Sequence, residues 1–160
     1  MIVLGIDPGT DCGWSLQENG QIKGGGVWLL DGGVSRREFE AETPDERLGR
    51  RLHLLHSKLS SLWGLMRWQR LAYELTHYKY PTQAQLHHAY VGVLSKFCWS
   101  YDVDVRRVSA ATVKKRWAGH GRADKDAMAD AAREKWPGRE WVDHNEVDAA
   151  LIAATVGGES

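Results

Sequence analysis

The first thirty residues contain three apolar stretches separated by two turn sequences, and this pattern restricts the fold more than any other part of the chain. Met1 to Ile6 is rich in apolar residues and runs into the turn sequence Asp7-Pro8-Gly9-Thr10. Asn19-Gly20 separates the apolar stretches 12–16 and 21–30, and this dipeptide is typical of a two-residue hairpin. The chain is therefore expected to open with an antiparallel meander of three strands.

Helical and strand patterns alternate along the rest of the chain. Thr43-Pro44-Asp45-Glu46 has the form of a capping box, and leucines spaced by three and four residues continue this helix to about Met66. Pro81-Thr82-Gln83-Ala84-Gln85 has the same form at the start of a second helix, which extends to about Tyr101. The other predicted elements are strands at 71–75 and 103–108 and helices at 110–118, 124–136 and 145–156.

The order of these elements predicts an α/β fold with a mixed five-stranded sheet. Three antiparallel strands are followed by two parallel ones, and helices lie on both faces. Residues 1–160 are expected to form a single domain, because this length suits one hydrophobic core. No apolar run approaches the roughly 18 residues that a membrane-spanning helix needs. Cys12 and Cys98 lack metal-binding spacing, so reduced thiols in a cytoplasm are expected.

Basic residues are concentrated in one segment, although the whole chain has 21 basic and 21 acidic residues. Overall charge therefore offers no argument for nucleic-acid binding. Within residues 106–125 the basic side chains, which are candidates for DNA contacts, are Arg106, Arg107, Lys114, Lys115, Arg116, Arg122 and Lys125. Gly119-His120-Gly121 would let backbone amides approach a phosphate. An ordinary solvated pair of helices would give the same charge pattern.

Three acidic residues stand in apolar surroundings where the predicted sheet would gather them. Asp7 ends the first strand, Glu74 lies near the end of the fourth, and Asp148 lies in an apolar helix. A carboxylate is costly to bury unless it is paired or binds a cation, although each could instead have a structural role. Converging carboxylates suit Mg²⁺ or Mn²⁺, and two such ions promote phosphodiester hydrolysis. We interpret His87-His88 as solvated or capping rather than as metal ligands.

Four segments resemble, in order, the motifs of the RuvC-type Holliday junction resolvases, which have the RNase H-like fold. Gly5-Ile6-Asp7-Pro8-Gly9-Thr10 resembles the opening motif of that family, and Ala72-Tyr73-Glu74 resembles its second acidic strand. Val113-Lys114 with residues 119–125 resembles the lysine-bearing segment, and residues 145–150 resemble the C-terminal acidic motif. The resemblance covers nearly the whole chain. The sequence looks more like the phage or prophage members of the family than like its cellular resolvases.

The resemblance implies an Mg²⁺-dependent endodeoxyribonuclease with two ions in each active site, where Mn²⁺ can substitute. It implies metal-binding roles for Asp7, Glu74 and Asp148, and catalytic or phosphate-facing roles for Lys114 and Lys125. It also implies a homodimer that cuts four-way DNA junctions in a bacterial or phage-infected cytoplasm, with no membrane and no small-molecule cofactor. A candidate subunit contact is the apolar face of the second helix, which carries Leu86, Tyr90, Val93, Leu94 and Phe97.

Three other functions are compatible with the sequence. A nuclease of the same fold could act on flaps, branched DNA or RNA–DNA hybrids. A second alternative is a junction-binding protein without catalytic activity. A third, an actin-like ATPase or sugar kinase, has a similar Asp-Pro-Gly-Thr loop but needs two lobes, for which 160 residues are too few.

Asn145 departs from the pattern of the family, which often has a second aspartate or a histidine three residues before the last aspartate. Asn145 and Asp148 share a helix face, so we expect Asn145 to contact the metal directly or through water. Asn145 could also be the N-cap of this helix. The alternative ligands are Glu146, the next residue, and Asp143, just upstream.

Overall fold

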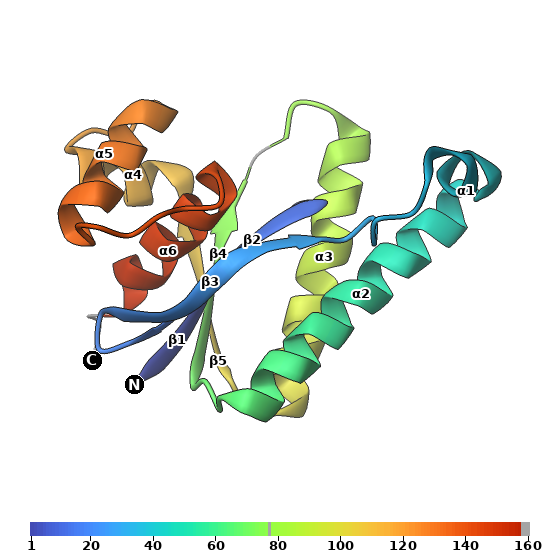
Figure 1. The fold of residues 1–160 in the computed structure, drawn as a ribbon, viewed down its shortest axis with the longest axis horizontal. Helices are drawn as coiled ribbons and strands as arrows, with labels where there is room; N and C mark the ends of the chain where they lie inside the picture. The colour runs from blue at the N-terminus through green and yellow to red at the C-terminus, as the bar shows by residue number, and fades with distance from the viewer. Residues whose placement is uncertain (77, 158–160) are drawn as a thin grey trace.

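The structure is a computed structural model that describes residues 1–76 and 78–157. Its centre is a five-stranded sheet with the strand order β3-β2-β1-β4-β5 (Figure 1). The strands are β1 (Ile2–Asp7), β2 (Asp11–Glu18), β3 (Gln21–Leu29), β4 (Arg70–Leu75) and β5 (Asp104–Ser109). β1, β2 and β3 pair antiparallel, whereas β4 pairs parallel with both β1 and β5. The predicted mixed sheet is therefore confirmed.

The hairpin between β2 and β3 is formed by Asn19 and Gly20, as the sequence predicts. Both residues have a left-handed backbone, with φ angles of 51° and 80°. Two consecutive positive φ angles are what a type I′ turn requires, and asparagine and glycine tolerate them best. The pairing register of β2 with β3 then shifts between Leu16 and Gln17, which indicates a bulge in the ladder.

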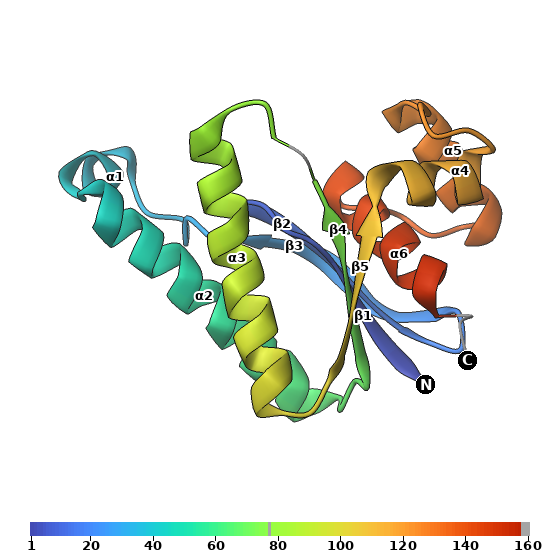
Figure 2. The ribbon, with the colours of Figure 1, turned by 180° about the vertical axis from the view of Figure 1, so that it is seen from behind.

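Helices cover both faces of the sheet (Figure 1, Figure 2). α2 (Pro44–Leu65) and α3 (Pro81–Ser100) lie on one face, and α4 (Ala110–Ala118), α5 (Lys125–Lys135) and α6 (His144–Val156) lie on the other. Each face has its own apolar core: one includes residues of α2 and α3, and the second includes residues of α4, α5 and α6. Within the described residues, no helix has both the length and the apolar character needed to cross a membrane.

The two predicted capping boxes have different outcomes. Thr43 caps α2, accepting from the amide of Glu46 while the Glu46 carboxylate accepts from the amide of Thr43, so this prediction is confirmed. The box predicted at Thr82 and Gln85 is wrong, because α3 already begins at Pro81 and its N-cap, Tyr80, makes no side-chain cap. Proline is favoured at the first helical position, and this places Thr82 inside the first turn.

One short helix, α1 (Arg36–Ala41), was not predicted from the sequence. It has no buried residue, so it lacks the apolar periodicity on which the helix predictions depend. A local signal was nevertheless present, because Ser35 and Glu38 form a capping box at its start. The helix depends on that box and on polar contacts rather than on core packing.

α6 lies unusually close to the sheet because two glycines in the strands leave room for it. A Cβ on Gly5 would overlap the backbone oxygen of Ala149, and one on Gly13 would overlap the backbone oxygen of Asn145. The Gly5 position also faces the small side chain of Ala153, 2.8 Å from where the Cβ would stand. Any side chain at these strand positions would push the helix away from the sheet.

We therefore expect Gly5→Ala to lower the free energy of unfolding by about 3 kcal/mol, the upper part of the range for overpacked cores. Gly92→Ala is the matched control, because Gly92 is exposed in α3 and a Cβ there meets no atom within 4 Å. Gly92→Ala should raise stability by about 0.5–1 kcal/mol, since alanine has the higher helix propensity. Denaturant unfolding of both variants tests this, and equal stabilities would contradict the close approach of α6.

Candidate active site

Asp7 and Glu74 are brought together by the pairing of two parallel strands. β1 and β4 pair in a register that places Ile6 beside Tyr73, so the next residues along, Asp7 and Glu74, lie at the same edge of the sheet. Parallel strands end at a common edge, and this edge is a frequent position for binding sites in α/β proteins. The sequence prediction that these two carboxylates converge therefore agrees with the strand register.

Asp148 reaches the same edge from α6. It shares a pocket of about 160 Å³ with Glu74, and the other polar residues of this pocket are Lys114, Lys125 and Asp124. Asp148 interrupts an otherwise buried run from Glu146 to Val156. We call this hollow the carboxylate pocket. It contains two of the three predicted carboxylates together with both predicted lysines.

Asp7 interacts electrostatically with residues of the same pocket. Burial raises the pKa of Asp7 to about 7, with further contributions from the negative charges of Asp148, Glu74 and Asp143, while Lys125 opposes the shift. Burial likewise raises the pKa of Asp148 to about 6, and repulsion from Glu74 adds to this. The pKa of Glu74 is raised by burial, against a hydrogen bond from Thr76 and the charge of Lys114. The three carboxylates are therefore held together despite their mutual repulsion.

The chemistry of these donors fits a hard divalent cation. Carboxylate oxygens are the ligands that Mg²⁺ and Mn²⁺ prefer, and a cation would favour the ionised form of all three acids. Between residues 1 and 76 and between 78 and 157, no three His, Cys, Asp or Glu side chains stand in the arrangement of a ready-made metal site. The carboxylates lie at one edge of the sheet and repel one another, but among the described residues they do not surround a single point as the ligands of a bound metal would.

The start of α6 differs in detail from the sequence predictions. Asp143 is the N-cap, accepting from the amides of Asn145 and Glu146 at 2.8 and 3.3 Å, so the prediction that Asn145 caps the helix is wrong. The side-chain amide of Asn145 also donates to Asp143, at 2.9 Å. Asp143 raises the pKa of Asp7, so its carboxylate lies near the site. A metal contact by Asn145 or by Asp143 stays a prediction.

Glu146, one of the alternative metal contacts, has other partners in the structure. Its carboxylate accepts from Arg139 at 2.5 Å and from the amide of Val142 at 2.8 Å, and its side chain is buried. A Cβ on Gly25 of β3 would lie 2.6 Å from the Glu146 carboxylate, which therefore packs against β3. Glu146 thus forms a buried ion pair, and these contacts favour Asn145 or Asp143 over Glu146 as the additional metal contact.

Two histidines near the site differ from the sequence analysis, which left His144 unassigned and misplaced His87. His144 lies four residues before Asp148 on α6, and its charge lowers the pKa of Asp148; the i,i+4 spacing was the available signal. His87 is buried and its Nδ1 lies 3.3 Å from the hydroxyl of Tyr78, so the solvated interpretation of this residue is wrong. Burial raises the pKa of the Tyr78 hydroxyl, and the negative charges of Asp7 and Glu74 raise it further.

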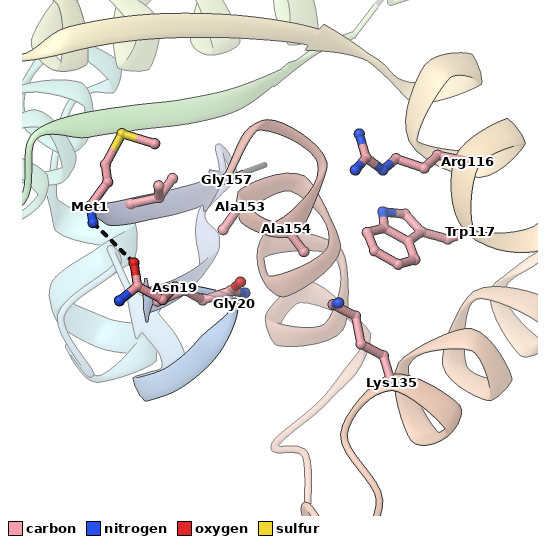
Figure 3. A pocket seen from close by; sticks show the side chains of 11 residues that line it. Met1, Asn19, Gly20, Arg116, Trp117, Lys135, Ala153, Ala154 and Gly157 are labelled. Carbon is pink, nitrogen blue, oxygen red and sulfur yellow. Dashed lines mark hydrogen bonds between the residues drawn. The ribbon is translucent and has the colours of Figure 1, made fainter. Parts of the chain in front are cut away.

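The seven basic candidates have different surroundings. Lys114 and Lys125 line the carboxylate pocket, whereas Arg106 pairs with Asp104 on β5 at 3.0 Å. Arg107, Lys115 and Arg122 are exposed. Arg116 donates to the backbone oxygen of Thr155 and lines a different pocket (Figure 3). Basic residues are concentrated in this segment of the sequence, but helix geometry directs Lys114 and Arg116 of α4 to two different pockets.

Comparisons with known proteins agree with this arrangement. The family model described as crossover junction endodeoxyribonuclease RuvC matches residues 3–134. Proteins of that name from Rickettsia akari (strain Hartford) and Rickettsia bellii (strain RML369-C) are each 29% identical, over 97% of this chain and 96% of theirs. The structure of Thermus thermophilus RuvC in complex with a Holliday junction substrate has a TM-score of 0.77 and 25% identity, covering 98% of this chain and 93% of that one. The yeast mitochondrial Holliday junction resolvase Ydc2 shares the fold, with a TM-score of 0.64 and 15% identity over 96% of this chain and 76% of its own.

The raised pKa of Asp7 predicts that this carboxylate destabilises the metal-free protein. A folded-state pKa of about 7, against 3.8 ordinarily, means that stability falls as pH rises from about 4 through 7. At pH 8, Asp7→Asn should therefore raise the free energy of unfolding by an amount on the order of 2–4 kcal/mol. Asp11→Asn, at an exposed position in β2, should change it little.

Thermal unfolding with and without Mg²⁺ measures both effects. Mg²⁺ should raise the Tm of the wild type and of Asp11→Asn, but barely that of Asp7→Asn, because the variant lacks the charged oxygen of the predicted ligand Asp7. An Asp7→Asn protein that is less stable than the wild type at pH 8 would contradict the repulsion described above.

Proposed function

The chain belongs to the RuvC family of crossover junction endodeoxyribonucleases, and we propose that it resolves four-way DNA junctions by hydrolysing phosphodiester bonds at the carboxylate pocket. The observation that carries the proposal is the meeting of Asp7, Glu74 and Asp148 from β1, β4 and α6 beside Lys114 and Lys125. Acidic side chains that bind cations, next to basic ones that attract phosphate, are the combination a nuclease needs.

We propose that the resident metal is Mg²⁺, replaceable by Mn²⁺, and that two ions bind between Asp7, Glu74 and Asp148. Asn145 is proposed as an additional contact, directly or through water. When bound, such ions activate a water molecule and neutralise charge on the phosphate. The support for this assignment is chemical: three carboxylates with raised pKa values supply the oxygen donors that a hard divalent cation prefers.

The two lysines act on the phosphate rather than on the metal. Lys114, on α4, and Lys125, at the first position of α5, both line the carboxylate pocket, where we place the phosphate. Fixed cations that are aimed at developing negative charge lower the barrier of phosphoryl chemistry. We propose that Lys125 stabilises the transition state, and that Lys114 holds the phosphate and limits repulsion around Glu74.

We further propose that the protein acts as a homodimer in a bacterial or phage-infected cytoplasm. A four-way junction has two-fold symmetry, and paired cuts need two active sites related by the same axis. The apolar face of α3 offers less surface than the sequence predicted, because Tyr90, Leu94 and Phe97 are buried in the core of the chain itself. Leu86 and Val93 are partly exposed and stay candidates for the subunit contact.

The mass of the protein in solution tests the homodimer. A mass of twice 18.0 kDa is the expected result, and a monomer with and without DNA would refute it.

Cleavage of a labelled four-way junction tests the proposal directly. The wild type should nick the junction with Mg²⁺ and not with EDTA. Asp7→Asn and Glu74→Gln should each abolish nicking while junction binding stays equal or tightens, because a charge that repels phosphate is removed. Asp11→Asn should cut at the wild-type rate.

Substrate and variant results separate the alternatives. Faster cleavage of flaps, other branched DNA or RNA–DNA hybrids would assign the same fold to another substrate. Tight binding of the junction without any cleavage would indicate a non-catalytic junction-binding protein. Cleavage by both carboxylate variants at the wild-type rate would refute the metal-dependent mechanism.

Lys125→Ala should reduce the single-turnover rate by about 100-fold, because one stabilising charge of the transition state is lost. Binding of the junction should weaken only a few-fold. Lys115→Ala is the control, since this exposed lysine on α4 does not line the pocket. An unchanged rate in Lys125→Ala, with saturating enzyme, would show that Lys125 is not catalytic.

A further inference from the structure

A second pocket lies away from the carboxylates, at the start of β1 and the end of α6. Its volume is about 350 Å³, and its lining includes Met1, Gly20, Arg116, Trp117, Lys135 and Ala154 (Figure 3). Met1 precedes β1 and Asp7 ends it, so the two pockets lie at opposite ends of a six-residue strand. At about 3.3 Å per residue, that strand is about 20 Å long. We call this second hollow the Trp117 pocket.

One wall of the Trp117 pocket is hydrogen-bonded to α6. The indole nitrogen of Trp117 donates to the backbone oxygen of Leu151 and to the hydroxyl of Thr155, at 3.1 and 2.9 Å. Arg116 donates to the backbone oxygen of Thr155 at 2.8 Å. The floor consists of small residues, which include Ala153 and Ala154. The packing of α4 against α6 therefore forms the pocket, and these hydrogen bonds hold Trp117 and Arg116 in its wall.

Two cations converge on the same indole. The Arg116 guanidinium lies 5.5 Å and the Lys135 ammonium 4.8 Å from the ring of Trp117. None of the residues that line the pocket is acidic, and within the described chain neither cation forms an ion pair with a carboxylate. Glu134 lines an adjoining hollow with Trp117 and Lys135 but pairs with neither cation among the described residues. Two like charges at one pocket without an ion-pair partner favour the binding of an anion.

We propose that the Trp117 pocket binds a phosphate group between Arg116 and Lys135. The phosphate has two possible sources: the backbone of a DNA arm, or a free phosphate compound. The DNA source is favoured by α5, which carries Lys125 at the carboxylate pocket and Lys135 at the Trp117 pocket. Ten residues of helix span about 15 Å, which corresponds to four or five base pairs of duplex. This part of the inference rests on the proposed function.

The test follows the indole N–H signal of Trp117 in the full-length protein by nuclear magnetic resonance. Trp117→Phe assigns the signal among those of the eight tryptophans. The protein is titrated without divalent metal, first with inorganic phosphate and then with a short DNA duplex. A saturable shift of the signal supports the proposal: a shift with duplex identifies DNA as the source, and a shift with phosphate alone identifies a free compound. No shift with either probe overturns it.

A variant pair tests the role of Lys135. Lys135→Gln should weaken whichever probe binds by about tenfold, and it should reduce the salt slope of DNA binding by about 0.9, the value for one phosphate contact. Arg133→Gln is the control, because Arg133 is exposed on the same helix and pairs with Asp130. Equal losses in the two variants would refute the site. Junction cleavage by the wild type is measured separately, so failure of the proposed function and failure of this site give different results.

Discussion

The close packing of α6 on β1 and β2 is the constraint on which the rest of the structure depends. Gly5 and Gly13 place no side chain between the strands and the helix. On the helix, small residues at 149 and 153 face the strands. Close contact over a long surface maximises dispersion and burial, which stabilise the second core. It also sets how far Asp148 stands from the sheet edge. A helix displaced by one side chain would carry Asp148 away from Asp7 and Glu74.

That packing holds an electrostatically unfavourable cluster in place. The pKa values of Asp7 and Asp148 are raised by burial and by the other carboxylates, so the ionised site opposes folding. Two apolar cores, one on each face of the sheet, supply the stability that offsets this cost. Unfavourable repulsion between charges that is offset by packing elsewhere is common at functional sites, because the charges are arranged to bind a ligand.

The helices after β5 distribute positive charge over two separate places. Lys114 and Arg116 are two residues apart on α4, and such residues point to different sides of a helix. Lys114 therefore lines the carboxylate pocket, while Arg116 lines the Trp117 pocket. α5 repeats the arrangement along its length, with Lys125 at one end and Lys135 at the other. The basic segment thus contributes side chains to two separate pockets.

The sequence by itself determined the order of the strands and most helices, the turn at Asn19-Gly20, the cap at Thr43, and the candidate carboxylates. Each of these depends on hydrogen bonds or apolar spacing within a few residues, or on motif order along the chain. Only the tertiary structure decided that Glu146 is buried as a partner of Arg139 and that Arg116 belongs to a separate pocket, whereas the Asp143 cap is a local contact that the sequence analysis missed. The physical reason is that a charged side chain takes its partner from whatever the fold brings near it. Glu146 is buried against β3, more than a hundred residues earlier in the chain, and no local pattern records that contact.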